Sequence, residues 1–92
     1  MDAETRYKIV KTHLVAPYRN MMQEPYSDDD ENNIYISFIV SEFKIEGLRK
    51  TVRRYPFCRL IEKGSLLPVG GFCKQYNVEL VIKKQNGRSD RE

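Results

Sequence analysis

The segment Ile34–Phe43 constrains the fold more than any other part of this 92-residue chain. Its apolar side chains alternate with mixed ones, which is the period of a β-strand. One face carries Ile34, Ile36, Phe38 and Val40, and the other carries Tyr35, Ser37, Ile39 and Ser41. A strand that is apolar on one face and mixed on the other is typical of a sheet that is well covered on one side only.

The hydrophobic period changes directly after this strand. Between residues 45 and 55, apolar side chains recur at the spacing of one helix face, at Ile45, Leu48, Val52 and Tyr55. This spacing predicts a helix that packs against the sheet. Gly47 weakens the helix by about 1 kcal/mol relative to alanine. Pro56 ends the predicted helix, because helical geometry is unfavourable for the residue that precedes a proline.

Residues 5–15 fit two interpretations. Five β-branched residues favour a strand, and this is the interpretation we prefer. The alternative is a helix, with Asp2 as its N-cap and with apolar residues at helical spacing, namely Ala3, Tyr7, Val10 and Leu14. Pro17 ends the element in either case and begins a short helix predicted over residues 17–24.

The rest of the chain divides into short elements. Residues 24–33 have turn composition and are predicted as a loop. Residues 57–62 are predicted as a short strand and residues 64–71 as a loop. A short helix is predicted up to Tyr76 with Asn77 as a left-handed cap, followed by a strand from Val78 to Lys84. The polar residues 85–92 are expected to form a mobile tail.

These elements predict one α+β domain over residues 1–84. We expect about four mostly antiparallel strands in one sheet, with two or three short helices on one face. The length leaves room for one hydrophobic core and one shallow cleft.

Composition narrows the class of protein. No apolar run approaches the ~20 residues that cross a bilayer, and the N-terminus lacks the pattern of a signal peptide. We therefore expect no membrane association and a cytoplasmic location. The two cysteines, Cys58 and Cys73, are expected to be reduced and buried. With a single histidine, His13, the chain predicts no zinc site, and nothing in the sequence indicates a cofactor.

Charge is unevenly distributed along the chain. Residues 24–31 contain five acidic residues and no basic one, whereas residues 44–63 contain seven basic and two acidic residues. The small net charge of +3 therefore includes an acidic segment and a basic segment of opposite charge.

The basic region is the main candidate binding site. On the predicted helix, Arg49, Lys50, Arg53 and Arg54 share the face opposite the apolar stripe, and no acidic residue stands four positions after any of them. Arg59 extends this set, and Lys83 or Lys84 would extend it further. Arginine suits bidentate contact with phosphate or carboxylate, and a polyanion would relieve the mutual repulsion. The alternatives are a solvated face, or pairing with the acidic segment of the same chain.

Two further sets of residues are weaker candidates. Asp28, Asp29, Asp30 and Glu31 form a solvated loop or a secondary partner-binding surface; their consecutive placement does not match a calcium loop. Four aromatic residues lie near the cations in sequence and would stack on unpaired bases if exposed, namely Tyr55, Phe57, Phe72 and Tyr76. Phe57 and Phe72 are expected to belong to the core.

The sequence thus predicts a small non-catalytic protein that binds nucleic acid or a nucleic-acid-containing complex. The alternative is an inhibitor or adaptor that blocks a host protein or ribonucleoprotein complex through protein contacts. In size and charge the chain resembles, in kind only, small regulators encoded by phages and mobile elements. A third hypothesis, an enzyme using Cys58, Cys73 or His13, has no supporting motif. An unpaired edge strand in so small a sheet offers a site for a second copy.

Overall fold

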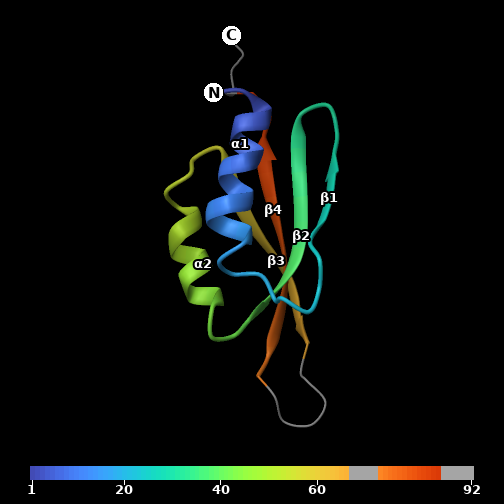
Figure 1. The fold of residues 1–92 in the computed structure, drawn as a ribbon, viewed down its shortest axis with the longest axis vertical. Helices are drawn as coiled ribbons and strands as arrows, with labels where there is room; N and C mark the ends of the chain where they lie inside the picture. Colours follow the sequence, from blue (N-terminus) through green and yellow to red (C-terminus); the bar gives the residue numbers. More distant parts are fainter. Residues whose placement is uncertain (67–72, 86–92) are drawn as a thin grey trace.

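A computed structural model describes residues 1–66 and 73–85. Helix α1 (Ala3–Val10) continues into η1 (Lys11–Val15), and the chain then forms β1 (Tyr26–Asp29), β2 (Asn33–Ser41), α2 (Ile45–Val52), β3 (Cys58–Leu66) and β4 (Gln75–Lys83). The strands make one sheet in the order β1-β2-β4-β3, and each neighbouring pair is antiparallel. Both helices lie on the same side of this sheet (Figure 1). The predicted α+β class is confirmed.

The N-terminal segment is helical, so the preferred strand interpretation of residues 5–15 is wrong. Asp2 caps α1 by accepting a hydrogen bond from the Thr5 backbone N–H at 2.8 Å. The last turn widens to a π-type turn, in which the Ala16 N–H donates to the Lys11 carbonyl at 2.9 Å. Val10 and Leu14 are fully buried. Burial of this apolar stripe outweighs the small strand preference of the β-branched residues.

The segment between η1 and β2 also differs from expectation. Residues 17–24 form turns instead of a short helix, and Arg19 makes an isolated bridge with Val40. Part of the predicted loop 24–33 is strand β1, in which Tyr26 pairs with Ser37 and Asp29 with Ile34. β1 lies at the sheet edge with all four side chains exposed, so its residues carry no apolar alternation by which to recognise a strand.

The core lies between the sheet and the two helices. As predicted, Ile36, Phe38 and Val40 of β2 face it, and they are joined by Val78, Leu80 and Ile82 of β4. α2 contributes Ile45, Leu48 and Val52, the stripe that its spacing predicted. The helix ends at Val52, before Tyr55 and Pro56. Both helices therefore pack on one sheet face, and no helix of the described residues covers the other face.

Gly47 has a packing role inside α2. A Cβ at this position would lie 2.9 Å from Cε1 of Tyr18, closer than real Cβ atoms come to a neighbour. The Tyr18 hydroxyl hydrogen-bonds Oγ1 of Thr51, one turn further along the helix, at 2.8 Å. Gly47 therefore allows the segment after η1 to lie directly against α2.

The last two strands are longer than predicted. The expected helix ending at Tyr76 is wrong, because Gln75 to Lys83 form β4 in continuous pairing with β2. Asn77 is a strand residue that pairs with Ile39 and not a left-handed cap. β3 extends to Leu66 with a bulge between Glu62 and Gly64, which takes in the start of the predicted loop.

Residues 67–71 of that predicted loop, Phe72, and residues 86–92 of the expected mobile tail lie outside the described residues. Within the described part of the chain, no helix is long and apolar enough to cross a membrane.

Candidate nucleic-acid interface

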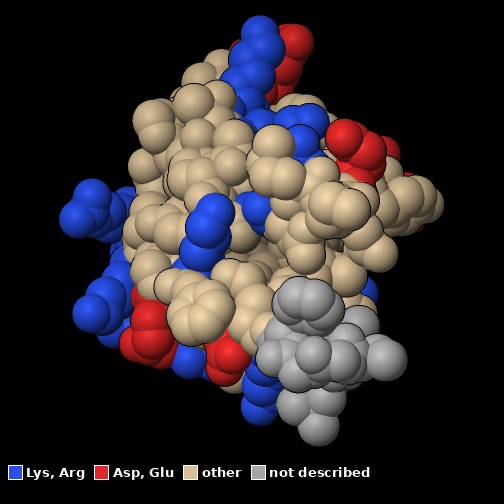
Figure 2. Space-filling view, turned by 60° about the horizontal axis from the view of Figure 1, so that its bottom comes forward, with Lys and Arg blue, Asp and Glu red and all other residues tan. Residues whose placement is uncertain are grey.

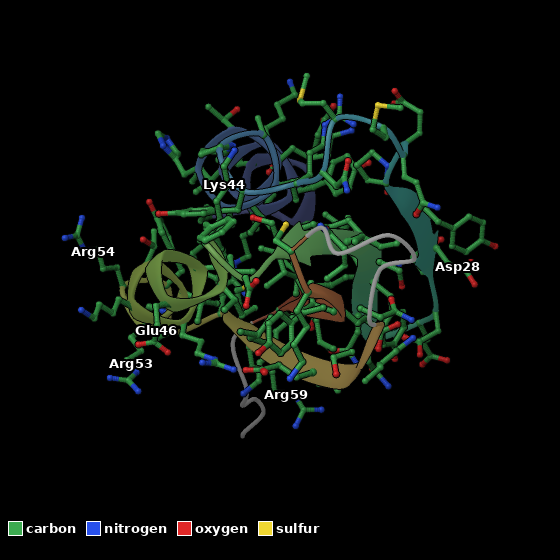
Figure 3. The ribbon with its side chains drawn as sticks, turned by 90° about the horizontal axis from the view of Figure 1, so that it is seen from below. Asp28, Lys44, Glu46, Arg53, Arg54 and Arg59 are labelled. Carbon is green, nitrogen blue, oxygen red and sulfur yellow. The ribbon has the colours of Figure 1, made fainter. Side chains whose placement is uncertain are left out.

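Three of the predicted cations project from one end of α2. Lys50 lies on the helix, and Arg53 and Arg54 follow directly after its last residue. All three are exposed, and none forms an ion pair with any described residue. Figure 3 shows the Arg53 and Arg54 side chains pointing away from the body of the molecule. Their charge is therefore presented to solvent.

Arg49 differs from its neighbours on the helix. Its Nε and Nη2 donate to the two carboxylate oxygens of Glu62 on β3, at 2.8 and 2.7 Å, and its Nη1 donates to Glu46 at 2.6 Å. Arg49 also lies over the Tyr76 ring, 5.7 Å from its centroid. The Arg49 hydrogen bonds lower the pKa of Glu62. Arg49 thus joins α2 to β3 and contributes little free charge to a binding surface.

Arg59 comes from β3, the edge strand that contacts α2. Its partner across the strand pair is Val81, so its side chain lies on the sheet face that the helices leave open. Arg59 is exposed and forms no ion pair with a described residue. Because β3 is an edge strand, Arg59 lies just around that edge from α2.

Two shallow hollows connect these cations. One, of about 360 Å³, lies between α2 and β3 and is lined by both Arg53 and Arg59. The other, of about 420 Å³, lies at the start of β3 and is lined by Arg59 and Lys83. Arg59 is common to both hollows. We call the three cations Arg53, Arg59 and Lys83 that line these hollows, together with Lys50 and Arg54 at the end of α2, the basic track.

Lys84 does not extend the track. Its Nζ lies 2.7 Å from Oδ2 of Asp29, the ion pair that ties the end of β4 to the acidic segment. Of the two lysines that the sequence offered as an extension, only Lys83 shares a hollow with Arg59.

The acidic residues lie on the other side of the molecule. Asp28 and Asp29 are in β1, and Asp30 and Glu31 form the turn into β2. Figure 3 shows Asp28 on the side opposite Arg53 and Arg54, and Figure 2 shows basic side chains protruding from the side where α2 lies. Among the described residues, none of these four acidic residues pairs with α2. The two charged regions therefore do not neutralise each other within one chain.

Part of the acidic segment is structural. Asp30 accepts hydrogen bonds from the Tyr35 hydroxyl at 2.6 Å and from the backbone N–H groups of Asn32 and Asn33. The Tyr35 bond is the main cause of the lowered pKa of Asp30. No group of three or more potential metal ligands occurs within the described residues. Asp30 thus shapes the β1–β2 turn.

The structure does not bring Cys58, Cys73 and His13 together as a nucleophile and its base. Cys58 is buried, and burial raises the pKa of its thiol to about 12, far from the low pKa of reactive thiols. Cys73 is half-buried and does not form a disulfide with Cys58. His13 is exposed and stacks on Tyr55 with the ring centroids 6.4 Å apart. No hydrogen bond joins His13 to either cysteine in the part of the chain that is described.

Sequence reasoning missed the partners of Arg49 and the composition of the second hollow. The spacing of Glu46, three residues before Arg49, was a usable signal for an ion pair on a helix. The pairing with Glu62 depends on how α2 lies against β3, and no local pattern encodes it. Asn33 and Phe57 reach the hollow beside Arg59 only because β2, β3 and β4 meet there.

Comparison of the chain with protein-family models, with curated proteins and with solved structures found no match. Any function proposed for this protein therefore rests on its own residues and geometry.

Proposed function

We propose that this protein binds nucleic acid through the basic track and has no catalytic role of its own. The observation that carries the proposal is the one-sided placement of exposed cations that lack ion-pair partners among the described residues, with the acidic segment on the opposite side. Phosphate groups are the natural partners of such a surface, because their binding relieves cation repulsion and releases counterions.

The composition of the track suits a phosphate backbone. Three of its five members are arginines, whose guanidinium groups bind phosphate oxygens in a bidentate manner. The track passes from the end of α2 around the β3 edge to the open sheet face, and this path follows a strand of nucleic acid better than it follows a compact anion. Backbone contacts of this kind give affinity without sequence preference.

The test is fluorescence anisotropy with labelled single-stranded RNA, single-stranded DNA and duplex DNA at several salt concentrations. About four phosphate contacts to a single strand give a slope of log K against log [salt] near −3. The double variant Arg53→Glu/Arg54→Glu should lose most of the affinity and flatten the slope by about 1.4, the share of two contacts.

The matched control is Lys11→Glu, which reverses an exposed cation beside Tyr7, away from the track. Tyr7 bonds Ser27 of β1, so Lys11 lies toward the acidic side. This control should change the affinity much less than reversal at Arg53. Equal losses in the two variants, or binding with no salt dependence, would contradict the proposal.

A second candidate function is the inhibitor or adaptor role, and exposed apolar side chains favour it. Met21, Met22 and Phe43 are 72%, 89% and 81% exposed, and large exposed apolar side chains of this kind can contribute to a protein interface. Figure 2 shows uncharged surface, interrupted by basic side chains, on the end of the molecule that is turned forward. If no nucleic acid binds at low salt, a pull-down that compares the wild type with Met22→Ser/Phe43→Ser tests this role. A partner captured by the wild type alone would support it.

A further inference from the structure

The hollow beside Arg59 has the features of a site for one flat, partly apolar group. It lies where β3 begins and β4 ends, and its volume is about 420 Å³. Pro56, Phe57 and Val81 supply apolar surface, and Asn33, Arg59 and Lys83 supply polar groups. A few polar groups around an apolar floor are typical of small-ligand sites.

The Phe57 ring is held in place from within the protein. The guanidinium of Arg6 lies over the ring, 5.0 Å from its centroid, and the Tyr55 ring contacts it edge-on at 6.0 Å. Arg6 is itself buried, and its Nη1 donates to the Lys83 backbone carbonyl at 2.8 Å. Phe57 is half-buried, so part of the ring remains available to the hollow. An aromatic ring fixed in this way can stack on a planar ligand without losing further conformational freedom.

Polar groups at the rim match the edge of a nucleobase. The Asn33 side-chain amide donates one hydrogen bond to the Tyr35 hydroxyl, at 3.3 Å. The amide of an asparagine has a second N–H and a carbonyl oxygen, so it can donate to and accept from a base at the same time. Arg59 and Lys83 supply the positive charge that a flanking phosphate requires.

We infer that this hollow receives an unpaired nucleobase of a single strand whose phosphates lie on the basic track. The inference rests on the proposed function and adds a preference for single-stranded over duplex nucleic acid. A base inside a duplex is stacked on both faces and cannot reach Phe57 unless it leaves the helix. Stacking of one base on an aromatic side chain is sequence-tolerant and strengthens binding by about tenfold or more.

The experiment compares a decanucleotide that carries one 2-aminopurine with the same sequence in a duplex, at equal salt. The wild type should bind the single strand at least about tenfold more tightly and quench the 2-aminopurine fluorescence, because the base stacks on Phe57. Phe57→Leu keeps the apolar volume and removes the aromatic face. It should abolish the quenching and lower single-strand affinity about tenfold, with duplex affinity unchanged.

The matched control is Tyr26→Leu, which removes an aromatic ring that is 67% exposed on β1, away from the hollow. This variant should keep both the quenching and the preference. Asn33→Ala provides a second variant should Phe57→Leu fail to fold. It should alter the relative affinities for the four homopolymers, because the loss of the amide removes contacts to the base edge.

The outcomes separate this inference from the proposed function. Salt-dependent binding with equal affinity for the single strand and the duplex would overturn the inference and leave the proposed function standing. Quenching that persists in Phe57→Leu would overturn the base site in the same way. Absence of binding to every nucleic acid would overturn both.

Discussion

Arg49 and Arg53 lie one helical turn apart, yet their surroundings give them different roles. Arg49 is held by Glu46 and Glu62 and lies over Tyr76. Arg53 has no ion-pair partner among the described residues. Charge at Arg49 therefore serves the contact between α2 and β3, and charge at Arg53 is available to a ligand.

At the residue scale, Glu62→Gln should make the free energy of unfolding less dependent on pH. Glu62 has a lowered pKa in the folded protein, mainly through its hydrogen bonds with Arg49. Its stabilising contribution is therefore present above the pKa of the unfolded state, about 4.3, and is lost as the pH falls through the folded pKa.

Urea unfolding of the wild type and Glu62→Gln over a range of pH checks this expectation. The wild type should be the more stable near neutral pH, and the difference should shrink as the pH falls below about 4. A constant difference down to the lowest pH would show that the Arg49–Glu62 ion pair contributes nothing measurable.

A second prediction at this scale concerns Cys58. Burial raises the pKa of its thiol to about 12, so in the folded protein little thiolate exists near neutral pH. Iodoacetamide should label Cys58 at least about a hundredfold more slowly in the native protein than in denaturant. Cys73 is half-buried and should react faster than Cys58 in the native state. Peptide mass spectrometry measures both rates, and rapid native labelling of Cys58 would revive the enzyme hypothesis.

At the scale of elements, the position of α2 depends on its contact with the segment after η1. Tyr18 fills the space beside Gly47 and bonds Thr51 through its hydroxyl. A glycine that costs helix stability in isolation thus allows a close approach in the folded protein. That approach sets where Arg53 and Arg54 emerge.

Gly47→Ala should therefore fail to give the stabilisation of about 1 kcal/mol that alanine normally provides in a helix. The added methyl group would meet the Tyr18 ring at 2.9 Å, and the ring must move. In a Tyr18→Ala background, the same substitution should recover the gain of about 1 kcal/mol, because the obstructing ring is absent. A double-mutant cycle by urea unfolding measures the coupling, and additive effects would contradict this account.

The two edge strands of the sheet, β1 and β3, differ in length and in the groups that lie beside them. β1 is a four-residue strand with two adjacent aspartates, which discourages pairing with another chain. β3 is a nine-residue strand, and α2 is joined to it by the Arg49–Glu62 ion pair. The edge that carries Arg59 is thus partly flanked by a helix, and the acidic edge is protected by charge.

At the scale of the whole molecule, Asp28 and Arg59 lie on the two edge strands of the sheet, in the cross-strand row that runs through Tyr35 and Val81. Three strand spacings of about 4.8 Å separate their backbones, a distance of roughly 14 Å that exceeds the roughly 8 Å over which charges are screened at physiological salt. A ligand on Arg53, Arg54 and Arg59 should therefore be almost insensitive to the charge of Asp28.

Asp28→Lys should accordingly leave nucleic-acid affinity within about twofold of the wild type at physiological salt. The change alters the net charge of the protein by the same amount as Arg54→Glu, with opposite sign. Anisotropy titrations of the two variants separate a local binding surface from a general effect of net charge. A gain in Asp28→Lys as large as the loss in Arg54→Glu would indicate that net charge alone controls binding.

Local sequence patterns predict the elements whose side chains alternate between core and solvent. β2 and α2 were predictable because Ile36, Phe38 and Leu48 recur at the spacing of a strand face or a helix face, and burial of that face decides the structure. The cations after Val52 were predictable as an exposed group for the same reason, since they lie opposite the apolar stripe.

The remaining features depend on tertiary contacts, because these contacts join residues that are far apart in the chain. The N-terminal segment is a helix because the sheet buries Val10 and Leu14, and β1 is a strand because β2 offers it a free edge. The charge of Arg49 is neutralised by Glu62, which lies on another element. Arg59 and Lys83 line the same hollow from neighbouring strands. No local hydrophobic pattern encodes these contacts, which depend on the order and register of the strands.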